Sequence, residues 1–194
     1  MANKVTFGLK NAHYAPFEVV DGEVIYEKPI PLPGSVELTL DPRGDLMEFY
    51  ADDIVYYSSD NNQGYEGTLT VAKITDEFLV EVLGQEEDEQ DGVLTERSDA
   101  KTRPFALMFE FDGDQKAVRH VLYNCTANRP TVGSSTKTES TEPNTSELTF
   151  IAGPRETDMA VKTKTTEGTP SEVYDAWYNE VYEKGESTGG GVEG

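Results

Sequence analysis

The segment from Gly64 to Gly84 changes its hydrophobic period midway, and this limits the folds that the chain can adopt. In its first half, Leu69 and Val71 alternate with polar residues, as in a strand with one buried face. In its second half, apolar residues between 78 and 83 recur at helical spacing. A helix of about ten residues is too short to be stable alone in water, so it needs a sheet to lie on. The segment therefore predicts a mainly β domain with one flanking α-helix.

Residue types at both ends place this helix at about residues 75–84. Thr75 suits the N-cap, and Asp76 and Glu77 suit the positively polarised first turn. Gly84 suits the position just past the last turn, where a left-handed backbone is common.

Alternating apolar residues elsewhere predict further β-strands. The clearest hairpin has Phe105–Phe111 as its first strand, a turn at Asp112–Asp114 and a return strand at Lys116–Ala127. Residues 11–34 contain several prolines and are expected to form mostly an extended arm or loop around a short strand at residues 24–26. A second helix is expected over Ser171–Tyr182. Further strands are expected at residues 4–10, 36–40, 54–57, 148–152 and 159–165.

The charge of the chain disfavours phosphate-bearing partners. The 194 residues carry a formal net charge of −21. Residues 41–99 hold 17 Asp or Glu and three Lys or Arg, a net charge of −14, so two-thirds of the excess lies there. Because nucleic acid and anionic membranes are themselves negative, neither is an expected binding partner.

The length fits one domain, expected over residues 1–183, with a flexible glycine-rich tail at 184–194. Cys125 is the single cysteine, so no internal disulfide is possible and a reducing compartment is favoured. The first eleven residues lack the apolar core of a secretion signal, and no apolar run is long enough to cross a bilayer.

Sequence patterns for catalysis are weak. The GxSxG pattern at residues 185–189 lies in the glycine-rich tail, away from the strand-to-helix turn on which that motif depends. His120 and Cys125 are five residues apart on one predicted strand, so alternation directs them to opposite faces. We expect no enzyme activity, no catalytic or metal-binding residues and no cofactor.

Apolar residues in the acidic segment 41–63 have two interpretations. Leu46, Met47, Phe49 and Tyr50 stand among Asp, Glu and Gly. They form either an ordinary core strand or an arm that packs on a neighbouring subunit. The sequence leaves both open.

The chain resembles the major tail proteins, or tail tube proteins, of long-tailed bacteriophages and prophages of Gram-positive bacteria. The matching residues occur in order and span almost the whole chain to about Glu183. They are residues 7–16 (FGLKNAHYAP), 40–45 (LDPRGD), 48–57 (EFYADDIVYY), 64–67 (GYEG), 104–107 (PFAL), 119–125 (RHVLYNC) and 177–178 (WY).

The resemblance implies a β-sandwich or barrel of the tail tube type with a flanking α-helix. It also implies hexameric rings that stack into a tube in the virion tail, assembled in the host bacterial cytoplasm. The tube surrounds a tape-measure protein, contacts the tail terminator and distal tail proteins, and conducts DNA without binding it specifically. No cofactor, reaction or membrane is implied. The candidate subunit interface is then Leu46, Met47, Phe49, Tyr50, Tyr56 and Tyr57.

Strand alternation gives a candidate lumen-facing set, although the same residues are equally suited to the outside of a tube. The set is Glu37, Thr39, Glu66, Thr68, Thr70 and Glu110. The opposite face, expected in the core, is Val36, Leu38, Leu40, Leu69, Val71, Phe105, Leu107, Phe109 and Phe111.

Two other functional classes stay open on sequence alone. One is a β-sandwich adhesion or carbohydrate-binding protein of a virion or cell surface, which requires an exposed aromatic platform. The other is a hydrolase that uses carboxylates distant in the sequence.

Overall fold

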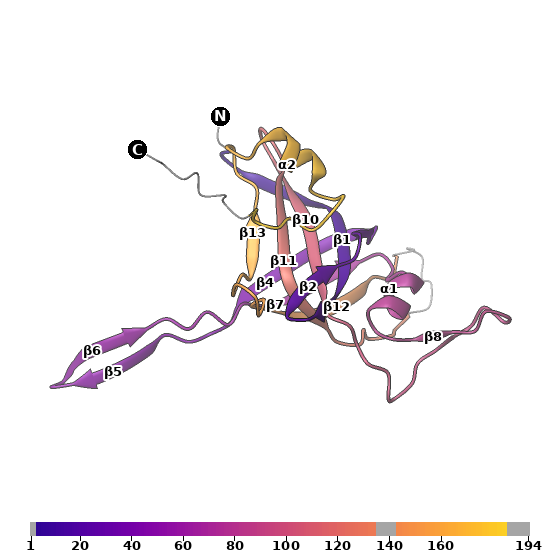
Figure 1. Cartoon of the computed structure of the whole chain (residues 1–194), viewed down its shortest axis with the longest axis horizontal. Helices are drawn as coiled ribbons and strands as arrows, with labels where there is room; N and C mark the ends of the chain where they lie inside the picture. The colour runs from indigo at the N-terminus through magenta and orange to yellow at the C-terminus, as the bar shows by residue number, and fades with distance from the viewer. Residues whose placement is uncertain (1–2, 135–142, 186–194) are drawn as a thin grey trace, which may run out of the picture.

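A computed structural model describes residues 3–134 and 143–185. The centre of the molecule is one curled antiparallel sheet with strand order β2-β1-β10-β11-β12-β7-β4, and β13 and β3 pair with β11 and β1 (Figure 1). The strands of this sheet are β1 (Thr6–Val20), β2 (Glu23–Tyr26), β3 (Ile30–Pro31), β4 (Ser35–Pro42), β7 (Tyr65–Val71), β10 (Phe105–Gly113), β11 (Val118–Ala127), β12 (Ser146–Gly153) and β13 (Lys162–Lys164).

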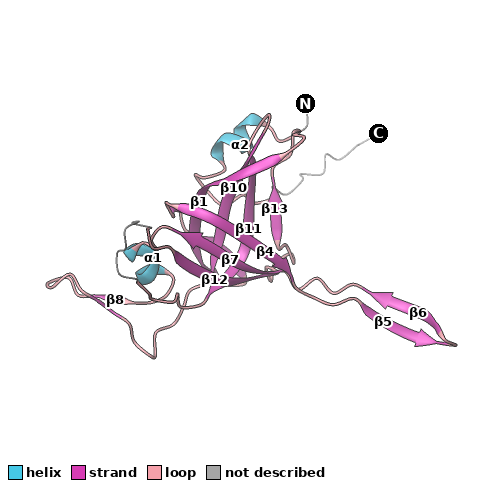
Figure 2. Cartoon of the chain, turned by 180° about the vertical axis from the view of Figure 1, so that it is seen from behind, coloured by secondary structure: helices cyan, strands magenta, loops and turns pink. Residues whose placement is uncertain are grey.

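Two small hairpins project from opposite ends of the molecule, and two short helices flank the sheet (Figure 2). The predicted mainly β fold with a flanking helix is confirmed. These elements are β5 (Met47–Ala51) with β6 (Ile54–Ser59), β8 (Glu86–Glu87) with β9 (Leu94–Thr95), α1 (Asp76–Glu81) and α2 (Ser171–Ala176).

Helix α1 has the predicted start. Thr75 is the N-cap, and its hydroxyl oxygen accepts a 3.3 Å hydrogen bond from the Phe78 amide. Gly84 has a φ of +71°, as expected past the helix end. Phe78 is fully buried and meets Phe105 edge-on, which anchors α1 on the sheet.

Strands β10 and β11 are covered on both faces. Phe105, Leu107 and Phe109 belong to an apolar layer that includes Phe78 of α1, which we call the α1 layer. Ala106 and Met108 belong to a second layer with Trp177 beside α2, the α2 layer. The chain therefore buries both sides of its central hairpin, which accounts for the continuous burial of Phe105–Glu110.

Irregular backbone explains two errors in the expected strands. Residues 11–20 continue strand β1 instead of forming a loop, with register shifts after Phe7 and Lys10. Val36 was expected in the core and is 59% exposed. The register of β4 shifts between Ser35 and Glu37, and this shift removes Val36 from the core face.

The last elements are shorter than their sequence patterns predict. Helix α2 ends at Ala176, before the predicted end at Tyr182, and the ring of Trp177 instead stacks on that of Tyr182 with centroids 5.4 Å apart. The strand expected over 159–165 is reduced to β13, because Met159 has a φ of +60° and lies in a turn. The predicted tail beyond residue 185 lies outside the described residues.

Candidate functional site

The β5–β6 hairpin is the most prominent projection of the molecule. We call residues 45–60 the arm. Asp52 and Asp53 form its two-residue turn with φ angles of 52° and 62°, the positive values of the turn type that suits the twist of a hairpin. Figures 1 and 2 show that the arm extends away from the sheet, so the structure makes this segment a projecting hairpin and not a core strand.

Apolar side chains of the arm lie open to solvent. All six candidate interface residues, Leu46, Met47, Phe49, Tyr50, Tyr56 and Tyr57, are between 55% and 72% exposed. Ile54 and Val55, which the sequence-based set omitted, are also exposed. An isolated two-stranded hairpin is only marginally stable in water. The arm has the composition of a surface that another molecule covers.

A second exposed surface is the outer face of β4, β7 and β12. Residues paired across these strands form three rows in register. The rows are Glu37–Thr70–Glu147, Thr39–Thr68–Thr149 and Asp41–Glu66–Ile151. We call this surface the polar face.

The polar face combines hydroxyl groups with carboxylates. Three threonines lie side by side in its middle row, and acidic residues occupy the rows on either side. Asp41 and Glu66 are directly opposite each other, a like-charge pair that disfavours the sheet unless solvent screens it. Five candidate lumen residues, Glu37, Thr39, Glu66, Thr68 and Thr70, lie on this face; sequence reasoning missed Glu147 and Thr149, although residues 146–152 alternate in the same way.

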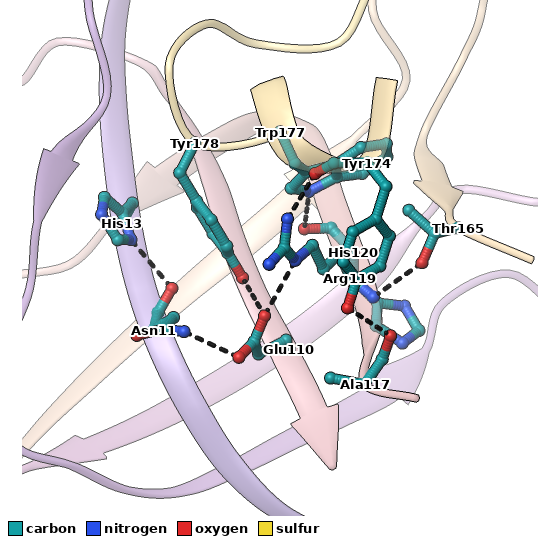
Figure 3. A network of polar contacts seen from close by, with 10 residues as sticks. All are labelled: Asn11, His13, Glu110, Ala117, Arg119, His120, Thr165, Tyr174, Trp177 and Tyr178. Carbon is teal, nitrogen blue, oxygen red and sulfur yellow. Dashed lines mark hydrogen bonds and ion pairs between the residues drawn. The ribbon is translucent and has the colours of Figure 1, made fainter. Parts of the chain in front are cut away.

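Glu110 does not lie on the polar face. It is only 6% exposed and faces the α2 layer, where the C-terminal segment covers β10. Its carboxylate accepts hydrogen bonds from Asn11 Nδ2 at 2.7 Å, Arg119 Nε at 3.0 Å and the Tyr178 hydroxyl at 3.1 Å (Figure 3). The sequence-based assignment of Glu110 as lumen-facing is therefore wrong in this subunit, because residues 171–182 cover the face that alternation left open.

The network around Glu110 attaches the C-terminal segment to the sheet. The Arg119 guanidinium lies 3.8 Å from the centroid of the Tyr174 ring and also donates to the Tyr174 carbonyl oxygen (Figure 3). Burial, and then the charge of Glu110, raise the pKa of the Tyr178 hydroxyl well above its usual value. The polar groups of the network satisfy one another's hydrogen bonds, and their role is to hold the C-terminal segment on the sheet.

His120 and Cys125 lie on the same face of β11, contrary to the prediction from alternation. Phe105 pairs with Cys125 while Leu107 pairs with Leu122, so β11 contains one extra residue and alternation is broken. The ring of His120 stacks on Phe109 with centroids 5.0 Å apart, and Cys125 is fully buried in the α1 layer.

The environments of His120 and Cys125 favour neutral side chains. Burial, and then Lys162 and Lys164, lower the pKa of His120 to about 4. Burial raises the pKa of the Cys125 thiol far above its usual value. No hydrogen bond joins the two side chains among the described residues.

Residues 3–134 and 143–185 show neither a metal site nor a helix that could span a membrane. No group of three His, Cys, Asp or Glu in this range has the geometry of a metal site. The helices of the same range are too short to cross a bilayer. Most of the GxSxG pattern falls after residue 185, outside the described residues.

Comparison with known proteins supports the fold assignment. No family model and no curated protein matches the sequence. Among solved structures, the cap of the anti-feeding prophage, a tube terminating cap studied by cryo-electron microscopy, matches with a TM-score of 0.50 and 13% sequence identity. The match covers 86% of this chain and 95% of the cap chain. At this identity the likeness concerns the fold alone, so the chain shares the overall fold of a tube-terminating cap protein.

Proposed function

We propose that the protein is a structural subunit of a phage tail, and specifically the major subunit of the tail tube. In this proposal six copies form a ring, and stacked rings enclose a tape-measure protein and later conduct DNA. Two independent lines support it: the fold shared with a tube-terminating cap, and the ordered sequence resemblance to tail tube proteins.

The observation that carries the proposal is the uncovered arm. An arm with seven large apolar side chains more than half exposed gains little from folding alone. Burial of such side chains against another subunit stabilises by about 1.5–3 kcal/mol each when it is complete. A subunit built for self-assembly has a reason to project such a hairpin, because a neighbouring copy can cover it.

The polar face is our candidate for the channel wall. Strand β4 is the last strand in the order of the main sheet, and we take its outer edge to pair with a neighbouring copy. Continued pairing around a ring would place rows of threonine and carboxylate along one surface. Neither group binds phosphate strongly, which suits a wall along which DNA slides.

The net charge is consistent with a conduit. Six copies at −21 give a ring −126 formal charges. Duplex DNA carries about one negative charge per 1.7 Å. Repulsion of like charges keeps DNA from adhering, and the same repulsion acts between subunits, so apolar burial at the arm must exceed it.

The remaining parts of the proposal follow from this role. The partners are further copies of the chain, the tape-measure protein, and the tail terminator and distal tail proteins. The location is the virion tail after assembly in the bacterial cytoplasm. We assign the protein no enzymatic activity, cofactor or membrane association.

A cap that terminates the tube is a second candidate, favoured by the described role of the structural neighbour. A cap would form single rings that do not elongate, whereas a tube subunit forms stacks of many rings. The adhesion or carbohydrate-binding alternative would instead use the exposed aromatic residues of the arm as a monomer. Glycan-array binding by a monomeric protein would favour that alternative.

The experiment removes the apolar contacts of the arm. Phe49→Ser combined with Tyr50→Ser should leave a folded monomer, because both side chains are exposed in the single subunit. Light scattering should show that this variant no longer forms tubes under conditions in which the unchanged protein does. The control is Val19→Ser with Val20→Ser, which alters exposed apolar residues on β1. Normal tubes from the arm variant would contradict the proposal.

A further inference from the structure

We propose that the acidic tip of the arm docks on a second copy of this chain at three lysines, Lys116, Lys162 and Lys164, which we call the lysine cluster. The inference rests on the proposed function, because it takes the arm to be an interface between copies. It adds the surface that receives the arm and the charges that select it.

All charged residues of the arm are acidic. Residues 45–60 contain five carboxylates and no Lys or Arg. None of these five takes part in the ion pairs of the described chain. The turn places two of them, Asp52 and Asp53, side by side at the end of the projection. The tip therefore presents two adjacent unpaired carboxylates beyond an apolar hairpin.

The lysine cluster is the complementary feature. In the described chain, Lys10, Arg103, Arg119 and Arg155 each contact a carboxylate. Two lysines of the cluster, Lys116 and Lys162, instead lie over aromatic rings. Lys116 lies 3.5 Å from the centroid of the Tyr174 ring, and Lys162 donates a 3.0 Å hydrogen bond to the Tyr65 hydroxyl. What distinguishes the three exposed lysines is their grouping, since two of them line one cleft and two lie on one short strand of a strongly negative chain.

The lysine cluster lies along a cleft and on strand β13. Lys116 and Lys164 line one cleft of about 510 Å³ with Thr165 and Thr166. Thr166 is exposed, and its hydroxyl group is a further donor for a carboxylate, whereas Thr165 is buried. Glu167 also lines this cleft, so its lining carries one more positive than negative charge. Lys162 and Lys164 alternate on β13 and point to the same side, opposite Leu122 and His120 of β11.

The occupant is a second copy. The arm extends away from the sheet, and β13 lies at the side of that sheet rather than along the arm, so a subunit does not cover its own lysine cluster (Figures 1 and 2). The other projection, the β8–β9 hairpin, carries Glu86, Glu87, Asp88, Glu89 and Asp91 and would repel the arm. Charge complementarity therefore directs the arm to the lysine cluster.

The test is a charge exchange in the full-length protein. Lys162→Glu with Lys164→Glu opposes the tip with like charge and should raise the protein concentration needed for tube assembly by about tenfold or more. Asp52→Lys with Asp53→Lys should do the same. The protein carrying all four changes should assemble at a concentration within about threefold of the unchanged protein, because the pairing is restored with reversed sign. Lys28→Glu with Lys101→Glu is the matched control, since both lysines are exposed and lie outside the cluster.

A crosslink tests the contact directly. One variant carries Asp53→Cys and the other Lys164→Cys, so a disulfide between them can form only between two molecules. Cys125 is fully buried and does not compete. Mixed tubes should give a disulfide-linked dimer on a non-reducing gel, and a mixture of Asp53→Cys with Lys28→Cys should not.

The outcomes separate the inference from the proposed function. Tubes that form without the crosslink, with no recovery in the fourfold variant, would overturn the docking site and leave the tube proposal standing. Failure of the unchanged protein to assemble would count against both. Loss in each double variant, recovery on exchange and the specific crosslink would support the docking site.

Discussion

Glu110 on β10 and Arg119 on β11 form an ion pair of 3.0 Å, with side chains that are 8% and 18% exposed. The two residues are also direct cross-strand partners. Around them, Tyr174 and Tyr178 bring the C-terminal segment onto the sheet. One buried pair therefore connects the central hairpin to residues more than fifty positions later in the chain.

Removing one member of this pair should destabilise the fold. Glu110→Ala leaves the Arg119 guanidinium buried without its carboxylate, and we expect the free energy of unfolding to fall by about 3 kcal/mol. Urea unfolding followed by circular dichroism measures the change. The control is Glu66→Ala, which removes an exposed carboxylate from the polar face and should change the free energy of unfolding by less than about 0.5 kcal/mol. Equal effects of the two substitutions would show that the network around Glu110 adds nothing to stability.

Gly67 is required for close packing between β7 and β12. A Cβ atom at this position would lie 2.3 Å from the Phe150 ring, which is fully buried in the α1 layer. Gly67→Ala should lower the free energy of unfolding by about 1–3 kcal/mol through overpacking. Gly153→Ala in the same sheet has open space around it and should cost less. Adding Phe150→Leu to Gly67→Ala should recover part of the loss, and a double variant no more stable than Gly67→Ala would argue against the steric explanation.

His120 should make stability depend on pH. Its pKa is lowered to about 4 by burial and then by Lys162 and Lys164, whereas an unfolded histidine titrates near pH 6.5. The unfolded chain therefore binds the proton more tightly, so the stability contributed by neutral His120 is complete above pH 6.5 and is lost as the pH falls toward 4.

A substitution that does not titrate isolates this effect. Between pH 7.5 and pH 4.5, the unchanged protein should lose about 2 kcal/mol more stability than His120→Phe, whose ring can keep the stacking on Phe109. Urea unfolding at a series of pH values measures the difference. Parallel pH curves for the two proteins would show that His120 is not held neutral by the fold.

Lysines on the polar face should make assembled tubes bind DNA. The variant combines Glu37→Lys, Glu66→Lys and Glu147→Lys, at exposed positions of β4, β7 and β12. Glu147 takes the place of Glu110 from the candidate lumen-facing set, because Glu110 is buried. Tubes of this variant should retain short linear duplex DNA, with an affinity that falls steeply as salt rises.

The topology of the DNA distinguishes a channel from an outer surface. Circular duplex DNA has no end to enter a tube, so it should not be retained by tubes whose lysines face the lumen. Retention of circular and linear DNA alike would place the polar face on the outside. Tubes with Glu87→Lys, Glu89→Lys and Asp91→Lys in and beside the β8–β9 hairpin are the control for added charge alone.

Local sequence signals predicted local structure well. Thr75 marks the start of α1 as predicted, because capping depends on neighbouring backbone groups alone. The helix ends at Glu81, three residues before Gly84, which has the expected left-handed backbone. The β10–β11 hairpin followed from alternation around a turn of Asp and Gly. The same alternation gave five of the six candidate residues on the polar face.

Local sequence signals could not predict β-bulges or the burial of a residue by a segment far along the chain. An extra residue in β11 places His120 and Cys125 on one face, and the shift in β4 exposes Val36. Glu110 is buried because a segment about sixty residues later covers it. Period-2 reasoning assumes an unbroken ladder and an open outer face, and it fails where either assumption does.

Electron microscopy of the purified full-length protein tests the central claim most directly. If the chain is a tail tube subunit, raising the protein concentration should produce tubes of uniform diameter built from stacked rings with sixfold symmetry, and the Phe49→Ser, Tyr50→Ser variant should remain monomeric. A protein that stays monomeric at every concentration, or that forms only single rings, would contradict the assignment as the tube subunit.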